Sequence, residues 1–199
     1  RGKIESIGIE SGGTHYNVNN PPRMVIDVPR DEDGTDLSLV PTSGATGFEG
    51  ERATAELVVD GSLKEVYIEK GGLGYPSNIS IDIIKDPTDT EYTGFDFSPA
   101  LVQPIVVGGA ITKIRILDAG KGYTKQPTIR VTPIMNQQAG VVENAILSAF
   151  VTGSISKVNI TNPGKRYKLD PTYELVKGSS ATGFVTVSNG KIIQTTIIN

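Results

Sequence analysis

The sequence predicts an all-β fold made of repeated three-stranded units. The first observation is compositional: Ile, Val and Thr number 22, 18 and 19 of the 199 residues, whereas Leu and Ala number 10 each. Side chains branched at Cβ favour strands over helices. The second observation is that short runs of alternating apolar and polar residues recur between glycine-containing turns. Alternation of this kind is typical of antiparallel sheets.

A third observation is a repeated segment. The clearest copy, GAITKIRILDAGKGYTKQPTIRV, begins at Gly109 and is matched by segments that begin at Gly61 and Gly153, and by a more divergent one at Gly2. A fifth copy begins at Gly190. Each copy starts with Gly-x-Ile-x-x-Ile-x-Ile, continues with Gly-x-Gly-Tyr, and ends with a proline and an alternating run. Such self-similarity indicates a repeat architecture.

Each repeat is expected to contain strand A, a tight turn, strand B, a Gly-x-Gly-Tyr corner and strand C. The repeats could build a prism, a sandwich or a stacked β array, and the pattern does not choose between them. The expected boundaries are 1–40 for a partial first repeat with an acidic loop, 41–93 for the second, 94–139 for the third, 140–178 for the fourth, and 179–199 for the start of a fifth.

Two-residue turns are predicted between strands A and B, because dipeptides such as Asp-Gly and Asn-Gly between alternating runs favour type I′ hairpins with φ > 0 at both residues. The dipeptides concerned are Asp60-Gly61, Gly108-Gly109, Thr152-Gly153 and Asn189-Gly190. Within strand B, Ile111 lies three residues before Ile114 instead of two. This spacing predicts a β-bulge near the start of the strand.

The Gly-x-Gly-Tyr corners are predicted to be structural, with a ligand site built from the tyrosines as the alternative. Glycine permits φ > 0, and the tyrosine ring can cover the end of the hairpin while its hydroxyl finds a partner. The corner residues are Gly72, Gly74, Tyr75, Gly120, Gly122 and Tyr123, with Tyr16 and Tyr167 in the other two copies. His15 and Arg166 replace the second glycine there. Either those two corners differ, or φ > 0 is not required at that position.

The composition removes several classes of function. Without cysteine there are no thiolate metal sites, disulfides or cysteine nucleophiles. The single histidine, His15, has no second imidazole for zinc and no partners for acid–base catalysis. A net charge of −3 argues against nucleic acid as a partner, and no apolar run is long enough to span a membrane. We therefore expect a non-enzymatic protein without metal or cofactor.

Two acidic loops interrupt the repeats. Residues 31–36 resemble a calcium loop, but the glycine comes fourth instead of sixth, and Thr42 stands where glutamate is needed. Residues 86–96 contain Asp89, Glu91 and Asp96. Both segments are predicted to be solvated insertions, and a loose cation site is the alternative.

Basic residues gather near the third and fourth corners. They are candidates for contact with an acidic partner surface, although ordinary solvation is the simpler interpretation because the whole chain is acidic. These candidates are Lys121, Lys125, Lys165, Arg166 and Lys168.

The repeat itself resembles a known one. Segments such as GKGYTKQPTIRV and GATGFEGERATAELVVDGSLKEVYIEKGGLGYP are similar to a repeat in virion structural proteins of tailed bacteriophages, especially T4-like phages and their cyanophage relatives. There the repeat occurs in tail, baseplate and fibre-associated chains, and similar repeats occur in bacterial surface and adhesin-like proteins. The resemblance covers residues 3–199. It implies a non-enzymatic module, located in a virion assembled in the host cytoplasm, that contacts other virion proteins or further copies of itself.

Two other functions compete with this one. The first is a carbohydrate-binding or host-attachment module that uses the corner tyrosines on a host surface glycan, although the absence of tryptophan counts against it. The second is a hydrolase on a β scaffold that uses paired loop carboxylates. We expect the purified protein to be monomeric or weakly associated and to lack hydrolase activity.

Overall fold

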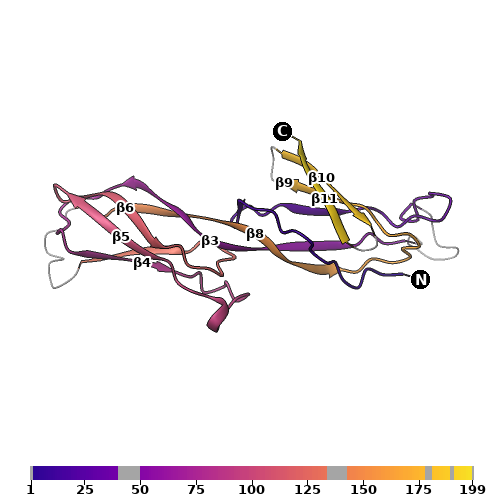
Figure 1. Ribbon diagram of the computed structural model, residues 1–199, viewed down its shortest axis with the longest axis horizontal. Coiled ribbons are helices and arrows are strands. Elements are labelled where there is room, and N and C mark those ends of the chain that lie inside the picture. The colour runs from indigo at the N-terminus through magenta and orange to yellow at the C-terminus, as the bar shows by residue number, and fades with distance from the viewer. Residues whose placement is uncertain (1, 40–49, 134–142, 178–180, 189–190, 199) are drawn as a thin grey trace. The chain divides into compact units, whose positions relative to one another are not determined.

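The computed structural model describes residues 2–39, 50–133, 143–177, 181–188 and 191–198, and these residues form an all-β protein, as predicted (Figure 1). One 3-10 helix, Gly94–Asp96, accompanies the strands. No helix in the described ranges has the length and apolar character needed to cross a membrane. The strands are β1 (Tyr16–Asn17), β2 (Arg23–Ile26), β3 (Thr54–Lys70), β4 (Ile79–Ile84), β5 (Leu101–Val107), β6 (Ala110–Asp118), β7 (Thr128–Pro133), β8 (Ile146–Asn162), β9 (Tyr173–Lys177), β10 (Ala181–Ser188) and β11 (Lys191–Ile198).

The chain forms two compact units. Unit 1 contains Arg1–Tyr16, Asn20–Val58 and Ile155–Asn199, and unit 2 contains Asn17–Asn19 and Val59–Ser154. The long strands β3 and β8 each contribute residues to both units. Unit 2 is thus nearly continuous in sequence, whereas unit 1 combines segments from both halves of the chain.

Three sheets organise the strands. β8 lies between β1 and β3 in a three-stranded sheet. Unit 1 has a four-stranded sheet in the order β11-β10-β9-β2, and unit 2 has one in the order β6-β5-β4-β7. Both four-stranded sheets are antiparallel.

The four-stranded sheet of unit 2 buries one face. Along β4, Ile79, Ile81 and Ile83 are buried, whereas Ser80 and Asp82 between them are partly exposed. Successive side chains of a strand point to opposite faces, so this alternation assigns one face to the core. The opposite face is available to solvent.

Two of the predicted turns are wrong. Asp60-Gly61 lies inside β3 and Thr152-Gly153 lies inside β8, and neither glycine has a positive φ. The reason for glycine at these places is close packing. A Cβ atom on Gly61 would lie 2.7 Å from side-chain atoms of Val18 and Val151. A larger residue at Gly61 would therefore destabilise the fold by overlapping these neighbours, and not by forcing a side chain into a left-handed backbone conformation.

The predicted hairpin at Gly108-Gly109 is confirmed. The two glycines have φ of +60° and +83° and join β5 to β6. Added Cβ atoms on Gly108 would meet nothing within 4 Å, so here the backbone conformation alone requires glycine. The fourth predicted turn, Asn189-Gly190, lies outside the described residues, between the paired strands β10 and β11.

The predicted bulge in strand B is also confirmed. The pairing of β5 with β6 shifts between Ile105 and Val106, which leaves Thr112 as the extra residue. The pairing of β10 with β11 shifts between Thr186 and Val187. An extra residue in one strand changes the side-chain period locally, which explains the three-residue spacing of isoleucines.

Candidate functional site

The four corner tyrosines are buried. The exposed fractions of Tyr16, Tyr75, Tyr123 and Tyr167 are 9%, 7%, 0% and 8%. Burial raises the pKa of the phenol groups of Tyr16, Tyr123 and Tyr167 above their ordinary value. Sugars stack on exposed aromatic faces, so these rings do not form the glycan platform considered as the alternative.

Three of the tyrosine hydroxyls are held in the same way. Each accepts a hydrogen bond from the backbone N–H of an alanine at the start of a predicted strand A. The three bonds join Ala100 to Tyr123 at 2.8 Å, Ala53 to Tyr167 at 2.9 Å and Ala145 to Tyr75 at 2.9 Å. A buried N–H without an acceptor is costly. Each tyrosine therefore fills space with its ring and also provides the acceptor for the N–H group at the start of a strand.

In three of the four corners the first glycine leaves room for the tyrosine ring, whereas an added Cβ at Gly120 would meet backbone atoms of residues 98–100. The φ of the first glycine is positive in all four copies, for example +71° at Gly72 and +67° at Gly164. A Cβ on Gly72 would lie 2.4 Å from Cε2 of Tyr75, and one on Gly164 would lie 2.6 Å from Cε2 of Tyr167. The ring can occupy its place only because these residues lack a side chain.

The second corner position also keeps a positive φ where it is not glycine. His15 has φ of +66° and Arg166 has φ of +63°, close to the +80° of Gly122. Neither explanation offered by the sequence is therefore correct, because these corners keep the same backbone and φ > 0 is retained. For residues with a Cβ this conformation costs about 1–2 kcal/mol.

We expect this strain to be measurable as a difference between glycine and alanine variants. At Arg166, the Gly variant should be more stable than the Ala variant by about 1 kcal/mol, because both lose the side chain and only glycine relieves the backbone. His15→Gly and His15→Ala should behave alike. The control is exposed Lys113 in β6, where glycine should be less stable than alanine by about 0.5–1 kcal/mol. Urea denaturation measures all six variants, and equal stability of the Arg166 pair would disprove the strain.

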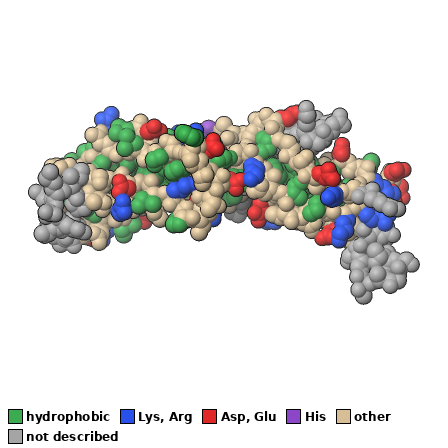
Figure 2. Space-filling model, turned by 90° about the horizontal axis from the view of Figure 1, so that it is seen from below, with side chains coloured by type: hydrophobic (Ala, Val, Ile, Leu, Met, Phe, Trp, Pro, Cys, Tyr) green, Lys and Arg blue, Asp and Glu red, His purple; other side chains and the backbone are tan. Residues whose placement is uncertain are grey.

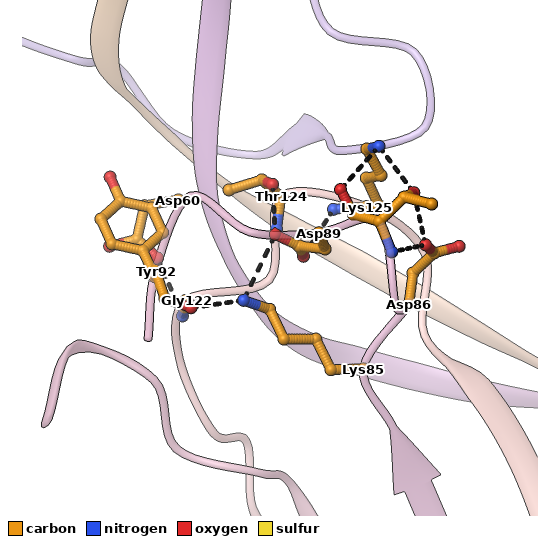
Figure 3. A network of polar contacts seen from close by, with 9 residues as sticks. Asp60, Lys85, Asp86, Asp89, Tyr92, Gly122, Thr124 and Lys125 are labelled. Carbon is orange, nitrogen blue, oxygen red and sulfur yellow. Dashed lines mark hydrogen bonds and ion pairs between the residues drawn. The ribbon is translucent and has the colours of Figure 1, made fainter. Parts of the chain in front are cut away.

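Most residues of the loop 86–96 are exposed, so the prediction of a solvated insertion holds for the loop as a whole. Asp89 is the exception, because it packs on the third corner. The side chain of Asp89 has no exposed surface. Its carboxylate accepts the backbone N–H of Thr124 at 2.8 Å and of Lys125 at 3.1 Å, and the Thr124 hydroxyl at 2.7 Å (Figure 3). Asp89 therefore fastens the loop to the residues that follow Tyr123.

Lys85 supports Asp89 from the other side. Its Nζ lies 3.3 Å from a carboxylate oxygen of Asp89, donates to the carbonyl oxygen of Tyr92 at 2.5 Å, and lies 4.7 Å from the centre of the Phe97 ring. That ring packs edge-on against Tyr123 with 5.3 Å between ring centres. The contacts of Lys85 and Phe97 thus connect the loop to the corner tyrosine Tyr123.

Further polar contacts close the loop. Asp60 accepts the N–H of Gly122 at 3.0 Å. Lys125 donates to the carbonyl oxygen of Thr88 at 3.0 Å, and Asp86 accepts the hydroxyl of Thr88 at 2.6 Å. The bonds from Thr88 hold the pKa of Asp86 below its ordinary value. Lys125, a predicted partner contact, thus binds the loop within the same chain.

The basic residues of the fourth corner are matched by acidic neighbours within unit 1. Lys165 lies 2.6 Å from Glu51 and lowers the pKa of that carboxyl group. Lys168 lies 2.5 Å from Asp31, which lowers the pKa of Asp31 and raises that of Lys168. The first acidic loop therefore contacts this corner. Lys121 lies at the third corner, where its backbone bridges to Ser98.

An open hollow of about 860 Å³ lies at the fourth corner. Its lining residues are Gly2, Lys3, Glu5, Pro163, Gly164, Lys165, Arg166 and Lys168. Because Lys165 and Lys168 already pair with carboxylates, the positive potential in the hollow is weaker than its lining suggests.

The exposed face of the unit 2 sheet carries aliphatic side chains. We call Leu101, Ile105, Val107 and Leu117, with exposed fractions of 58%, 36%, 62% and 56%, the β5–β6 face. The three β5 residues alternate along the strand, so they share one side of the sheet. The register places Lys113 opposite Ile105 and Arg115 opposite Gln103. The same register places the exposed Asp118 opposite Leu101, so charges of both signs border the apolar side chains.

In the ranges that the structure describes, no three His, Asp or Glu side chains are placed to hold a metal ion. On the face seen in Figure 2, acidic and basic side chains alternate with hydrophobic ones and form no large field of one sign. The β5–β6 face carries four of the exposed large hydrophobic side chains in the described part of the chain.

The chain was compared with protein-family models, with curated proteins and with solved structures, and none of the three comparisons found a match.

Proposed function

We propose that this chain is a non-enzymatic structural module of a tailed-phage virion, in the tail or baseplate region, and that it binds another structural protein through the β5–β6 face. The observation that carries the proposal is the set of exposed aliphatic side chains on this face, Leu101 and Val107 above all. Contiguous exposed apolar surface commonly marks a protein-binding site. The virion context rests on the resemblance of the repeat.

The rigidity of the surrounding structure supports this role. β5 and β6 are joined by a two-residue turn and paired along their length. Side chains on a paired hairpin lose little further freedom on binding, so less of the binding energy is spent on ordering them. A surface of this kind suits permanent assembly.

The charges at the border of the β5–β6 face indicate which charges the partner surface should carry. Lys113 and Arg115 lie on β6 beside Ile105 and are exposed. Complementary charges at the rim of an interface set orientation and exclude wrong partners. Asp118 of β6 lies opposite Leu101. We therefore expect the partner to present a flat apolar surface with Asp or Glu side chains opposite Lys113 and Arg115 and a basic side chain opposite Asp118.

Incorporation into particles tests the proposal. In phage that carry the altered gene, Val107→Asp should lower the copies per purified particle at least tenfold, because a buried unpaired carboxylate costs more than about 1.4 kcal/mol. The matched control is Leu169→Asp in unit 1, where Leu169 is 52% exposed; it should be incorporated normally. Thermal melts should show that both variants fold. Absence of the unaltered chain from particles, or equal incorporation of both variants, would refute the proposal.

The carbohydrate-binding alternative has less support. Its candidate residues were the corner tyrosines, and these are buried. A glycan array probed with the unaltered protein distinguishes the two functions, because strong binding there would favour host attachment.

A further inference from the structure

The two four-stranded sheets are assembled from corresponding parts of the sequence repeat. In unit 2, the order β6-β5-β4-β7 corresponds to strands B and A of the third copy, then strand C of the second and strand C of the third. In unit 1, the order β11-β10-β9-β2 corresponds to strands B and A of the fifth copy, then strand C of the fourth and strand C of the first. The first copy thus supplies a strand where the third copy supplies one in unit 2.

Strand B of the first copy, residues 3–9, follows the same correspondence. Each unit contains two B segments that contact each other: those of the second and third copies in unit 2, and those of the first and fourth copies in unit 1. A backbone N–H near the start of each segment donates to a carbonyl oxygen just after the end of the other segment. In unit 2 the bonds run from Leu63 to Ala119 at 2.9 Å and from Ile111 to Gly71 at 2.9 Å. In unit 1 they run from Ile155 to Gly12 at 2.8 Å and from Ile4 to Pro163 at 2.9 Å. Residues 3–9 therefore take the position that β6 takes in unit 2.

The two units differ in what pairs with strand A. In unit 2, β6 makes both sets of contacts, because it bonds to its fellow B segment at its ends and pairs with β5 along its length. In unit 1 these roles are divided. The end contacts are made through Ile4 and Gly12, residues 3–9 belong to no strand, and β11 pairs with β10. Two segments of unit 1 thus correspond to one segment of unit 2.

The two segments are similar in sequence. Residues 2–9 read GKIESIGI and residues 190–197 read GKIIQTTI, so both begin with Gly-Lys-Ile and end with Ile. In the observed sheet, Val187 pairs with Ile192 and Thr186 pairs with Gln194, so β11 has one extra residue at the bulge. Both segments have the sequence pattern that this bulge requires. If residues 2–9 replaced residues 190–197 in the same register, Val187 would pair with Ile4 and Thr186 would pair with Ser6.

We propose that residues 3–9 are a second partner strand for β10, so that unit 1 exchanges between two pairings and releases β11 in one of them. The two-residue connection to β10 favours β11, because closing a short loop costs little entropy. Residues 3–9 are already held in the same unit through Ile4, so their local concentration near β10 is also high. A released β11 would be an unpaired strand that a second chain could bind.

Engineered disulfides test the exchange, and the chain has no cysteine of its own to interfere. Ser6→Cys with Thr186→Cys should form an intramolecular disulfide under mild oxidation, because paired residues of neighbouring strands lie within disulfide reach. Thr186→Cys with Gln194→Cys should trap the pairing of β10 with β11. Ser6→Cys with Thr182→Cys is the matched control; its residues are out of register, and it should cross-link at least tenfold more slowly. A Ser6–Thr186 rate equal to that control, or an intermolecular disulfide in place of the intramolecular one, would overturn the proposal.

Weakening β11 supplies a second measurement. Ile192→Pro removes a backbone donor from β11, and it should raise the rate of the Ser6–Thr186 cross-link at least tenfold. Hydrogen exchange of the same variant without cysteines should show slower exchange at residues 3–9. Amides 3–9 that exchange as fast as in the unaltered protein, with β4 and β7 still protected, would show that these residues do not replace β11.

Discussion

Tyr123→Ala is expected to destabilise unit 2 by about 3–5 kcal/mol, the range for removing a buried aromatic side chain. Tyr123 has an exposed fraction of 0%, and its ring packs edge-on against Phe97. Its hydroxyl accepts the N–H of Ala100 at 2.8 Å. The alanine variant would therefore leave both a cavity and an unsatisfied backbone donor. Urea denaturation, with hydrogen exchange at β4 and β7 to identify unit 2, measures the loss.

Two variants separate the contributions. Tyr123→Phe keeps most of the ring contacts but removes the acceptor for Ala100, so it should cost about 1–3 kcal/mol. Phe95→Ala removes a side chain with an exposed fraction of 100%, so the free energy of unfolding should stay unchanged. An unaltered transition for Tyr123→Ala would mean that the ring is not part of the scaffold.

Asp89→Ala is expected to destabilise unit 2 by about 3–5 kcal/mol, the range for removing one partner of a buried ion pair. Lys85 would keep its charge, with a side chain only 15% exposed and its carboxylate partner gone. The N–H groups of Thr124 and Lys125 would lose their acceptor as well. The free energy of unfolding from urea titrations gives the size of the effect.

Charge and hydrogen bonding can be distinguished at the same position. Asp89→Asn keeps one acceptor oxygen but no charge, so it should lie between the alanine variant and the unaltered protein. Asp96→Ala is the matched control, because it removes an exposed carboxylate from the same loop and should change stability by less than about 0.5 kcal/mol. If Asp89→Ala were as stable as Asp96→Ala, the loop would not be fastened by Asp89.

Local patterns in the sequence were sufficient to predict the fold class and several details. The excess of β-branched residues predicted strands, the spacing of Ile111 and Ile114 predicted the bulge, and Gly108-Gly109 predicted a hairpin. These features depend on residues that are close together in the chain. Their physical causes, side-chain branching and backbone conformation, act within a few residues.

Features that depend on distant residues were missed. Gly61 has the same local surroundings as a turn glycine, but its role is set by Val18 and Val151. Asp89 stands in a polar loop that suggests solvation, yet its partner Thr124 is 35 residues away in sequence. Nothing in the neighbouring residues indicates either contact. The exposed β5–β6 face was missed because the alternating run in β5 predicts a strand without showing which side is covered.

The division of the chain between the units has a consequence for the order of folding. Unit 2 is nearly continuous, from Val59 to Ser154, so most of its contacts can form as soon as that stretch leaves the ribosome. Unit 1 needs pairs such as Ala53 with Tyr167, which are 114 residues apart in sequence. Contacts between such distant residues form slowly. β2 and the part of β3 that belongs to unit 1 therefore remain unpaired until the later half of the chain has been made. Chaperone dependence should be concentrated in unit 1.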